Sequence, residues 1–337
     1  MLSNIPYDIY RLIINNIYVI DVLNLRLTNK ENKELVKIFD PSYMICINKP
    51  FEIFEVFPCI KSISISNRLN ISNNDFKYFN KIEKLNMSGC YQKIIYDDSF
   101  QYLLNIKELN LLGCNQNWFD GNHFSDKSFS YITNLITLKL NNNHIITDNA
   151  LQKLINIKNL EIYDCSKITN NGLCNLINLE NLYLYKINIT DILFKKLNNI
   201  KELSVIDCDI TDNGIKYLTN LKKLKLVIVK NIKCKDFDKL NIDDLYLSDL
   251  NINDEDFLYL KNIKKLYISY LKINGQGLKY LNNIEKIQIM DIPICDNCIN
   301  NLFNLKNITE IKINMCHSIS ENKINELKEK FGDKLIH

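Results

Sequence analysis

The 337-residue sequence lacks most of the features by which enzymes and membrane proteins are recognised. It has no glycine-rich phosphate-binding loop, and no apolar run approaches the roughly 18 residues needed to span a bilayer. Its four histidines are scattered, without the spacing of metal ligands. The formal net charge is only +3, which does not favour a nucleic acid or a membrane as partner. We therefore expect no enzyme activity, no cofactor and no bound metal.

What the sequence does contain is a repeat. Between residues 200 and 290 an apolar residue recurs every 21 positions and opens the pattern apolar-x-apolar; these residues are Leu203, Leu224, Leu245, Leu266 and Ile287. The alternation predicts a short strand with both apolar residues on one face. The same position falls at Ile63, Leu85, Leu109, Leu138, Leu160, Leu182 and Ile311, with insertions that lengthen the step to as much as 29. Residues 60–337 therefore hold about twelve repeats.

Each repeat is predicted to be a strand, a turn and a helix. Thr211 or Asp212 can cap a helix start, and Ile215 and Leu218 would share one face of that helix. We interpret the series Asp148, Asp191, Asp212 and Asp254 as helix caps and not as catalytic groups. Stacked repeats bury the apolar face that one repeat cannot bury alone. Parallel strands with helical crossovers predict a right-handed α/β solenoid, with strands on the concave side and helices on the convex side.

Residues 200–215 and 157–173 match the phrase Leu-x-x-Leu-x-Leu-x-x-Cys-x-Ile-Thr-Asp-x-Gly-Leu. This phrase resembles the cysteine-containing subtype of leucine-rich repeats. Five of the eleven cysteines share one position of the repeat, five residues after the first strand leucine; they are Cys90, Cys114, Cys165, Cys208 and Cys316. We expect them to form a buried column of reduced thiols, which indicates a reducing compartment.

The start of the chain does not have the pattern of a secretion signal. Together with the thiols this predicts a cytoplasmic protein. The abundance of Asn, Ile and Lys is similar to that of proteins from AT-rich genomes, such as those of some protists and large DNA viruses. For a viral protein the compartment would be the cytoplasm of the host cell.

Residues 1–40 do not follow the repeat and are predicted to form three short helices. Residues 5–13 and 21–30 resemble the F-box, although the family's following Trp is Asn32 here. The resemblance implies binding to the Skp-type adaptor of a cullin ubiquitin ligase, with the solenoid recruiting a protein substrate. The matching apolar positions are Ile5, Pro6, Ile9, Leu12, Ile13, Leu25 and Leu27. The alternative is a free-standing repeat protein that binds or blocks a cellular or host partner, with residues 1–40 as a structural cap.

Residues 41–59 are expected to be a connector or a degenerate capping strand, because Pro41, Pro50 and Pro58 interrupt regular structure. At the other end, residues 321–331 predict a last helix that Gly332 would stop. Residues 334–336 would then form a closing strand.

Outward strand positions carry the candidate partner-binding surface of the concave face. They are Tyr163, Tyr183, Tyr185, Ile206, Val227, Tyr246, Tyr267 and Met290, which we call the aromatic strip. Asp164, Asp207, Asp249 and Asp291 are expected to line one edge of it. Exposed aromatic residues and methionine are typical of interfaces, but Tyr and Val also simply favour strands. The insertion at residues 115–125 contains Trp118 and Phe119, which would form either a binding lip or packing over the flank of the solenoid.

Cys295 and Cys298 have the spacing of a redox or zinc pair. In the repeat they replace the Thr and the Gly of the Ile-Thr-Asp-x-Gly phrase, and no second Cys or His pair stands nearby in the sequence. The expectation is therefore that they hold no metal and carry no redox chemistry.

Overall fold

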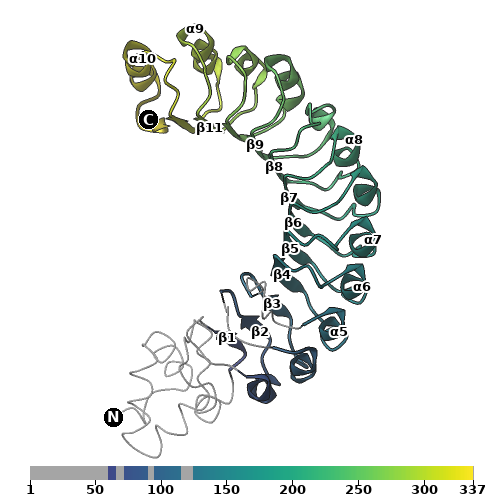
Figure 1. Ribbon diagram of the computed structural model, residues 1–337. Helices are drawn as coiled ribbons and strands as arrows, with labels where there is room; N and C mark the ends of the chain where they lie inside the picture. The colour runs from purple at the N-terminus through teal and green to yellow at the C-terminus, as the bar shows by residue number, and fades with distance from the viewer. Residues whose placement is uncertain (1–59, 66–71, 90–94, 115–123, 337) are drawn as a thin grey trace, which may run out of the picture. The chain divides into compact units, whose positions relative to one another are not determined.

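A computed structural model of the chain describes residues 60–65, 72–89, 95–114 and 124–336 (Figure 1). The chain divides between Ile157 and Lys158 into two compact units. The adaptor-binding set in residues 1–40, the connector at 41–59, the lip residues Trp118 and Phe119, and Cys90 lie outside the described residues. The predictions made for them stay predictions.

In the described residues of the first unit, four parallel strands follow one another in the order of the sequence, each followed by a helical segment. The strands are β1 (Ser62–Ser64), β2 (Lys84–Asn86), β3 (Glu108–Asn110) and β4 (Thr137–Asn141). The helical segments, with 3-10 helices written η, are η2 (Asn73–Phe79), η3 (Asp97–Tyr102), α5 (Asp126–Phe129) and α6 (Asp148–Leu151). The register places Ile63, Leu85, Leu109 and Leu138 side by side.

The second unit continues the same pattern. Its strands are β5 (Asn159–Tyr163), β6 (Asn181–Tyr185), β7 (Glu202–Ile206), β8 (Lys223–Val227), β9 (Asp244–Ser248), β10 (Lys265–Ser269), β11 (Lys286–Met290), β12 (Glu310–Asn314) and β13 (Leu335–Ile336). Its helical segments are α7 (Asn170–Leu173), η4 (Asp191–Lys195), α8 (Asp212–Ile215), η5 (Phe237–Lys239), η6 (Asp254–Leu260), η7 (Gln276–Tyr280), α9 (Asp296–Ile299), η8 (Asn300–Asn304), α10 (Glu321–Phe331) and η9 (Gly332–Lys334). Within this unit the strands lie along the inner side of a curve and the helical segments along the outer side (Figure 1).

The buried column predicted from the period of 21 is present. Leu203, Leu224, Leu245 and Leu266 are paired in register across β7 to β10, and each is at most 2% exposed. The fold class, a right-handed α/β solenoid of parallel strands and short helices, is confirmed. The last helix and the stop at Gly332, where φ is +54°, are confirmed as well, and β13 pairs with β12.

The helical segments are shorter than the sequence suggested. Most are one turn of α-helix or a 3-10 helix, because a 21-residue repeat with a five-residue strand leaves few residues for the return. At α8 the structure decides between Thr211 and Asp212. The Thr211 hydroxyl accepts a hydrogen bond from the Asn213 amide at 3.1 Å, so Thr211 is the cap and Asp212 is the first helical residue.

The aspartates of the repeat link one repeat to the next, and their interpretation as caps was wrong. The Asp191 carboxylate accepts hydrogen bonds from the Thr211 amide at 2.8 Å and from the Thr211 hydroxyl at 2.6 Å. Asp126 and Asp296 make the same pair of bonds to Thr147 and Ser320. We call this series the carboxylate ladder. Asp212 and Asp254 likewise accept hydrogen bonds from the backbone amides of Lys233 and Asn274 in the next repeat.

Candidate protein-binding face

The aromatic strip lies on the strand side of the second unit. All eight of its residues are half-buried, while the leucines that alternate with them are buried, so the strip points away from the core as predicted. The parallel register divides it into two rows. Tyr163, Tyr185, Ile206 and Val227 form one row; Tyr183, Tyr246 and Tyr267 belong to the other, with Ser204 and Lys225 between them.

The first row does not run unbroken to Met290. Ser248 and Ser269 occupy the positions between Val227 and Met290, and both are buried, at 5% and 3% exposure. Their hydroxyls are hydrogen-bonded to each other at 2.8 Å. Met290 is therefore separated from the rest of its row by two small polar residues, whereas the sequence pattern alone places all eight residues in one strip.

Neighbouring tyrosine rings contact each other in two places. Tyr163 and Tyr185 lie with ring centroids 6.5 Å apart, and Tyr246 and Tyr267 lie 6.3 Å apart and nearly parallel. The Lys225 ammonium lies 4.8 Å from the centroid of the Tyr246 ring. Such contacts hold the rings in place before a partner arrives, which lowers the entropic cost of binding.

Carboxylates at the strand surface hold two of the phenols. The Tyr163 hydroxyl donates to Glu161 at 3.3 Å, and the Tyr183 hydroxyl donates to Glu202 at 3.2 Å. Burial, together with the Glu161 carboxylate, raises the pKa of Tyr163 to about 12. Burial and the Glu202 carboxylate also raise the pKa of Tyr183. Both phenols therefore stay protonated and act as hydrogen-bond donors.

A hollow of about 400 Å³ opens in the second row. It forms where the small Ser204 stands between Tyr183 and Lys225, and Tyr246 and Tyr267 also line it. A hollow with aromatic walls can receive one large side chain of a partner protein.

Charges surround this hollow on the strand surface. Lys223 and Glu202 form an ion pair at 2.7 Å, and the hydrogen bond from Lys223 to this carboxylate raises the pKa of Lys223. Burial raises the pKa of Asp244. The rim is thus polar and the walls aromatic, which is the usual anatomy of a protein interface.

The acidic edge of the strip has a structural reason that the sequence pattern did not reveal. Asp164, Asp207, Asp249 and Asp291 each follow a strand with φ between +50° and +51°. Asp tolerates this left-handed conformation better than most residues. The left-handed turn therefore explains why aspartate occupies these four positions, without any contact to a partner.

Neither the known protein-family models nor the curated proteins give a match to this chain. Solved structures do. An internalin (inlF) from Listeria monocytogenes str. 4b F2365 superimposes with a TM-score of 0.60 at 17% identity, covering 98% of this chain and 94% of that one. The LRR protein LIC12759 of Leptospira interrogans gives 0.52 at 14% identity, covering 95% and 98%. A chain of the yeast Rad7 and Elc1 complex gives 0.54 at 18% identity, covering 98% and 92%.

This chain folds as a leucine-rich-repeat solenoid. At such identities the likeness shows the fold alone, and the fold serves many binding tasks. Among its described residues, no group of three or more His, Cys, Asp or Glu is placed to hold a metal ion. In that same part of the chain, no helix has the length and apolar character to cross a membrane.

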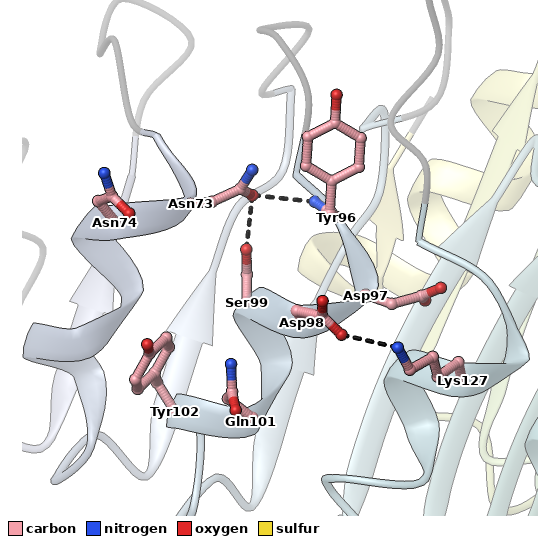
Figure 2. Close-up of a pocket in the computed structure, with 9 residues that line it drawn as sticks. All are labelled: Asn73, Asn74, Tyr96, Asp97, Asp98, Ser99, Gln101, Tyr102 and Lys127. Atoms are coloured by element: carbon pink, nitrogen blue, oxygen red, sulfur yellow. Dashed lines mark hydrogen bonds and ion pairs between the residues drawn. The ribbon is translucent and has the colours of Figure 1, made fainter.

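A second hollow, of about 430 Å³, lies at the helical edge of the first unit of the solenoid (Figure 2). Several of its polar groups are bonded to each other. The Asn73 side-chain oxygen accepts from the Tyr96 amide at 2.9 Å and from the Ser99 hydroxyl at 2.5 Å, and Asp98 pairs with Lys127 at 2.8 Å. These bonds join successive repeats, so we assign this hollow a structural role.

The predicted cysteine column is buried wherever it is described. Cys114, Cys165, Cys208 and Cys316 are reduced cysteines with at most 9% exposure. The Cys114 thiol donates to the Met87 carbonyl at 3.0 Å, and burial raises the pKa of Cys208 and Cys316. These thiols fill space beside turn backbone, and those of Cys165 and Cys208 donate to the backbone carbonyls of Tyr163 and Ile206 at 3.5 and 3.4 Å.

Proposed function

We propose that this protein is a non-enzymatic recognition subunit of a cullin-type ubiquitin ligase. In this proposal residues 1–40 bind the Skp-type adaptor, and the aromatic strip of the second unit binds a protein substrate. The protein supplies proximity and no bond-making group.

The observation that carries the substrate part is the pair of tyrosine clusters with the hollow at Ser204. Tyr183, Tyr246 and Tyr267 are half-buried around a space of about 400 Å³, and the rings of Tyr246 and Tyr267 contact each other. Tyrosine is among the residues that contribute most to binding energy at interfaces. The strands hold these side chains rigidly, which suits recognition of a folded or extended protein segment.

The ligase part rests on the F-box resemblance of residues 5–13 and 21–30. It gains support from the similarity in fold to a chain of the Rad7 and Elc1 complex, since that structure shows a protein of this architecture assembled with a different protein. The alternative, a free-standing binding module, is favoured by one observation. The aromatic strip lies wholly within residues 163–290, on paired strands of the second unit.

Binding of a purified Skp-type adaptor to the full chain tests the ligase part by calorimetry. We expect binding, and we expect the double substitution Pro6→Ala and Leu25→Ala to weaken it. The matched control is Tyr246→Ala with Tyr267→Ala, which should bind the adaptor unchanged, because these residues belong to the substrate face. A full chain that does not bind the adaptor would refute the ligase assignment and leave the free-standing module.

A further inference from the structure

Cys295 and Cys298 lie together at the start of α9. Cys295 is the cap residue and Cys298 the third residue of the helix, and their sulfur atoms are 3.3 Å apart. A disulfide bond is about 2.0 Å long, so a small side-chain rotation would bring the two sulfurs to bonding distance. Their separation from other cysteines in the sequence argues against a four-ligand metal site. The distance from other cysteines does not argue against a reaction that needs only two thiols.

The two thiols differ in access. Cys295 is exposed, whereas Cys298 is buried at 7% exposure. Hydrogen bonding with the Cys298 thiol lowers the pKa of Cys295. Burial, followed by the neighbouring Cys295, raises the pKa of Cys298 to about 11. The exposed Cys295 thiol, with its lowered pKa, therefore lies beside the buried Cys298 thiol, with its raised pKa. This arrangement suits Cys295 as the attacking thiol and Cys298 as the resolving thiol.

The carboxylate ladder is interrupted at this point. In the repeat that ends at β8, Gly214 has no room for a side chain, because an added Cβ would lie 2.6 Å from Asp191 Oδ1. Cys298 occupies the same place, 84 residues later, and the ladder position that faces it is Gly275 instead of an aspartate. A Cβ on Gly275 would lie 3.2 Å from the Cys298 Cβ. Loss of the aspartate thus makes the space that the buried thiol fills.

The exposed thiol of Cys295 occupies the position at which other repeats have a helix-capping hydroxyl. At the corresponding positions the hydroxyls of Thr147, Thr169 and Thr211 cap their helices, each accepting a backbone hydrogen bond. Cys295 makes no side-chain cap bond to α9. Gly275, Cys295 and Cys298 are therefore three departures from the repeat at one place, and together they form a dithiol while giving up a cap that stabilises other helices of the solenoid.

We propose that Cys295 and Cys298 form a reactive dithiol that is oxidised to a disulfide by low-molecular-weight disulfides. The Cys295 thiolate attacks one sulfur of the small disulfide, forming a mixed disulfide and releasing one small thiolate. Cys298 then loses its proton, and its sulfur attacks the Cys295 sulfur and releases the second small thiol. The protein loses two electrons and two protons in total, and one small disulfide becomes two small thiols. This proposal does not depend on the proposed ligase function.

The test treats the full chain with oxidised glutathione, blocks the remaining thiols with iodoacetamide and maps the peptides by mass spectrometry. We expect a peptide with an internal bond between Cys295 and Cys298 and a mass loss of two hydrogen atoms. Cys298→Ser should instead accumulate glutathione on Cys295, because no resolving thiol remains. Cys295→Ser should leave Cys298 free of both modifications, because the buried thiol cannot begin the reaction.

Cys174 provides the matched control, since it is a half-exposed single cysteine at the end of another short helix. Glutathione should reach Cys295 of the Cys298→Ser variant at least ~10-fold faster than it reaches Cys174. The proposal is overturned if both thiols of the unsubstituted chain remain open to alkylation after oxidation. It is also overturned if Cys295 and Cys174 react at equal rates.

Discussion

In both units the strands bury a column of apolar residues, but the residues that point outward from the strands differ. In the first unit, strands β1 to β3 are three residues long, and the outward positions of β1 to β4 hold Ser, Asn, Glu, Thr and Lys around a hollow of about 260 Å³. In the second unit the strands β5 to β12 have five residues and the same positions hold the tyrosines of the aromatic strip. The inward leucines fix the fold in both, so the outward residues are free to differ. This difference is the reason why we propose the second unit as the recognition surface.

Truncation of a buried strand leucine should lower the stability of the protein more than any other substitution considered below. Leu109→Ala in the first unit and Leu224→Ala in the second should each lower the free energy of unfolding by ~2–5 kcal/mol, because each leucine is at most 2% exposed in its column. Urea unfolding followed by circular dichroism measures both. A loss below ~1 kcal/mol at either site would mean that the columns are not equivalent.

This core is also the part that the sequence predicts best. A period of 21 with apolar-x-apolar strands has few physical solutions, so the residues from Leu203 to Ile287, α10 and the closing strand follow from the sequence pattern alone. The carboxylate ladder does not, because Asp191 and Thr211 are 20 residues apart and meet only when repeats stack. The same holds for the hydrogen-bonded Ser248 and Ser269, which divide the predicted strip.

Substitutions in the carboxylate ladder should have the next largest effect on stability. The pH dependence of this effect should differ between the two units. Asp97 of the first unit accepts four hydrogen bonds from the amides and hydroxyls of Ser125 and Ser128. Although burial opposes it, these bonds lower the pKa of Asp97 below its ordinary 3.8. Asp97→Asn should therefore cost ~1–3 kcal/mol at neutral pH. Urea unfolding across pH measures the difference in free energy of unfolding between the unchanged chain and Asp97→Asn. This difference should shrink as pH falls from 3.8 through the folded pKa of Asp97.

Asp212 of the second unit should behave in the opposite way. Burial raises its pKa, although its carboxylate accepts from the Lys233 amide at 2.9 Å. The folded protein then holds the proton to higher pH than the unfolded chain, so ionisation costs stability at neutral pH. The cost declines as pH falls below the folded pKa and is gone below the ordinary 3.8. Asp212→Asn should leave neutral-pH stability unchanged or raise it. A loss like that of Asp97→Asn would contradict this assignment.

A smaller effect is expected at the turns that follow the strands. Asn142 in the first unit and Ile228 in the second both have positive φ, +47° and +56°. Asn accepts this conformation, whereas a β-branched residue is strained there. Ile228→Asn should raise the free energy of unfolding by ~1 kcal/mol, and Asn142→Ile should lower it by a similar amount. Equal melting temperatures for all three proteins would show that the turns relax without strain.

Site-specific photo-cross-linking in cells can show whether a partner protein binds at the aromatic strip. The full chain would carry a benzophenone amino acid in place of Tyr267 on the strip, or in place of Tyr217, which is 38% exposed on the helical side of the same unit. We expect one defined protein to be captured from position 267 and not from position 217. We also expect the purified partner to bind Tyr246→Ala at least ~10-fold more weakly than the unchanged chain. Capture from position 217 alone, or equal affinity for the Tyr246→Ala variant, would contradict binding at the aromatic strip.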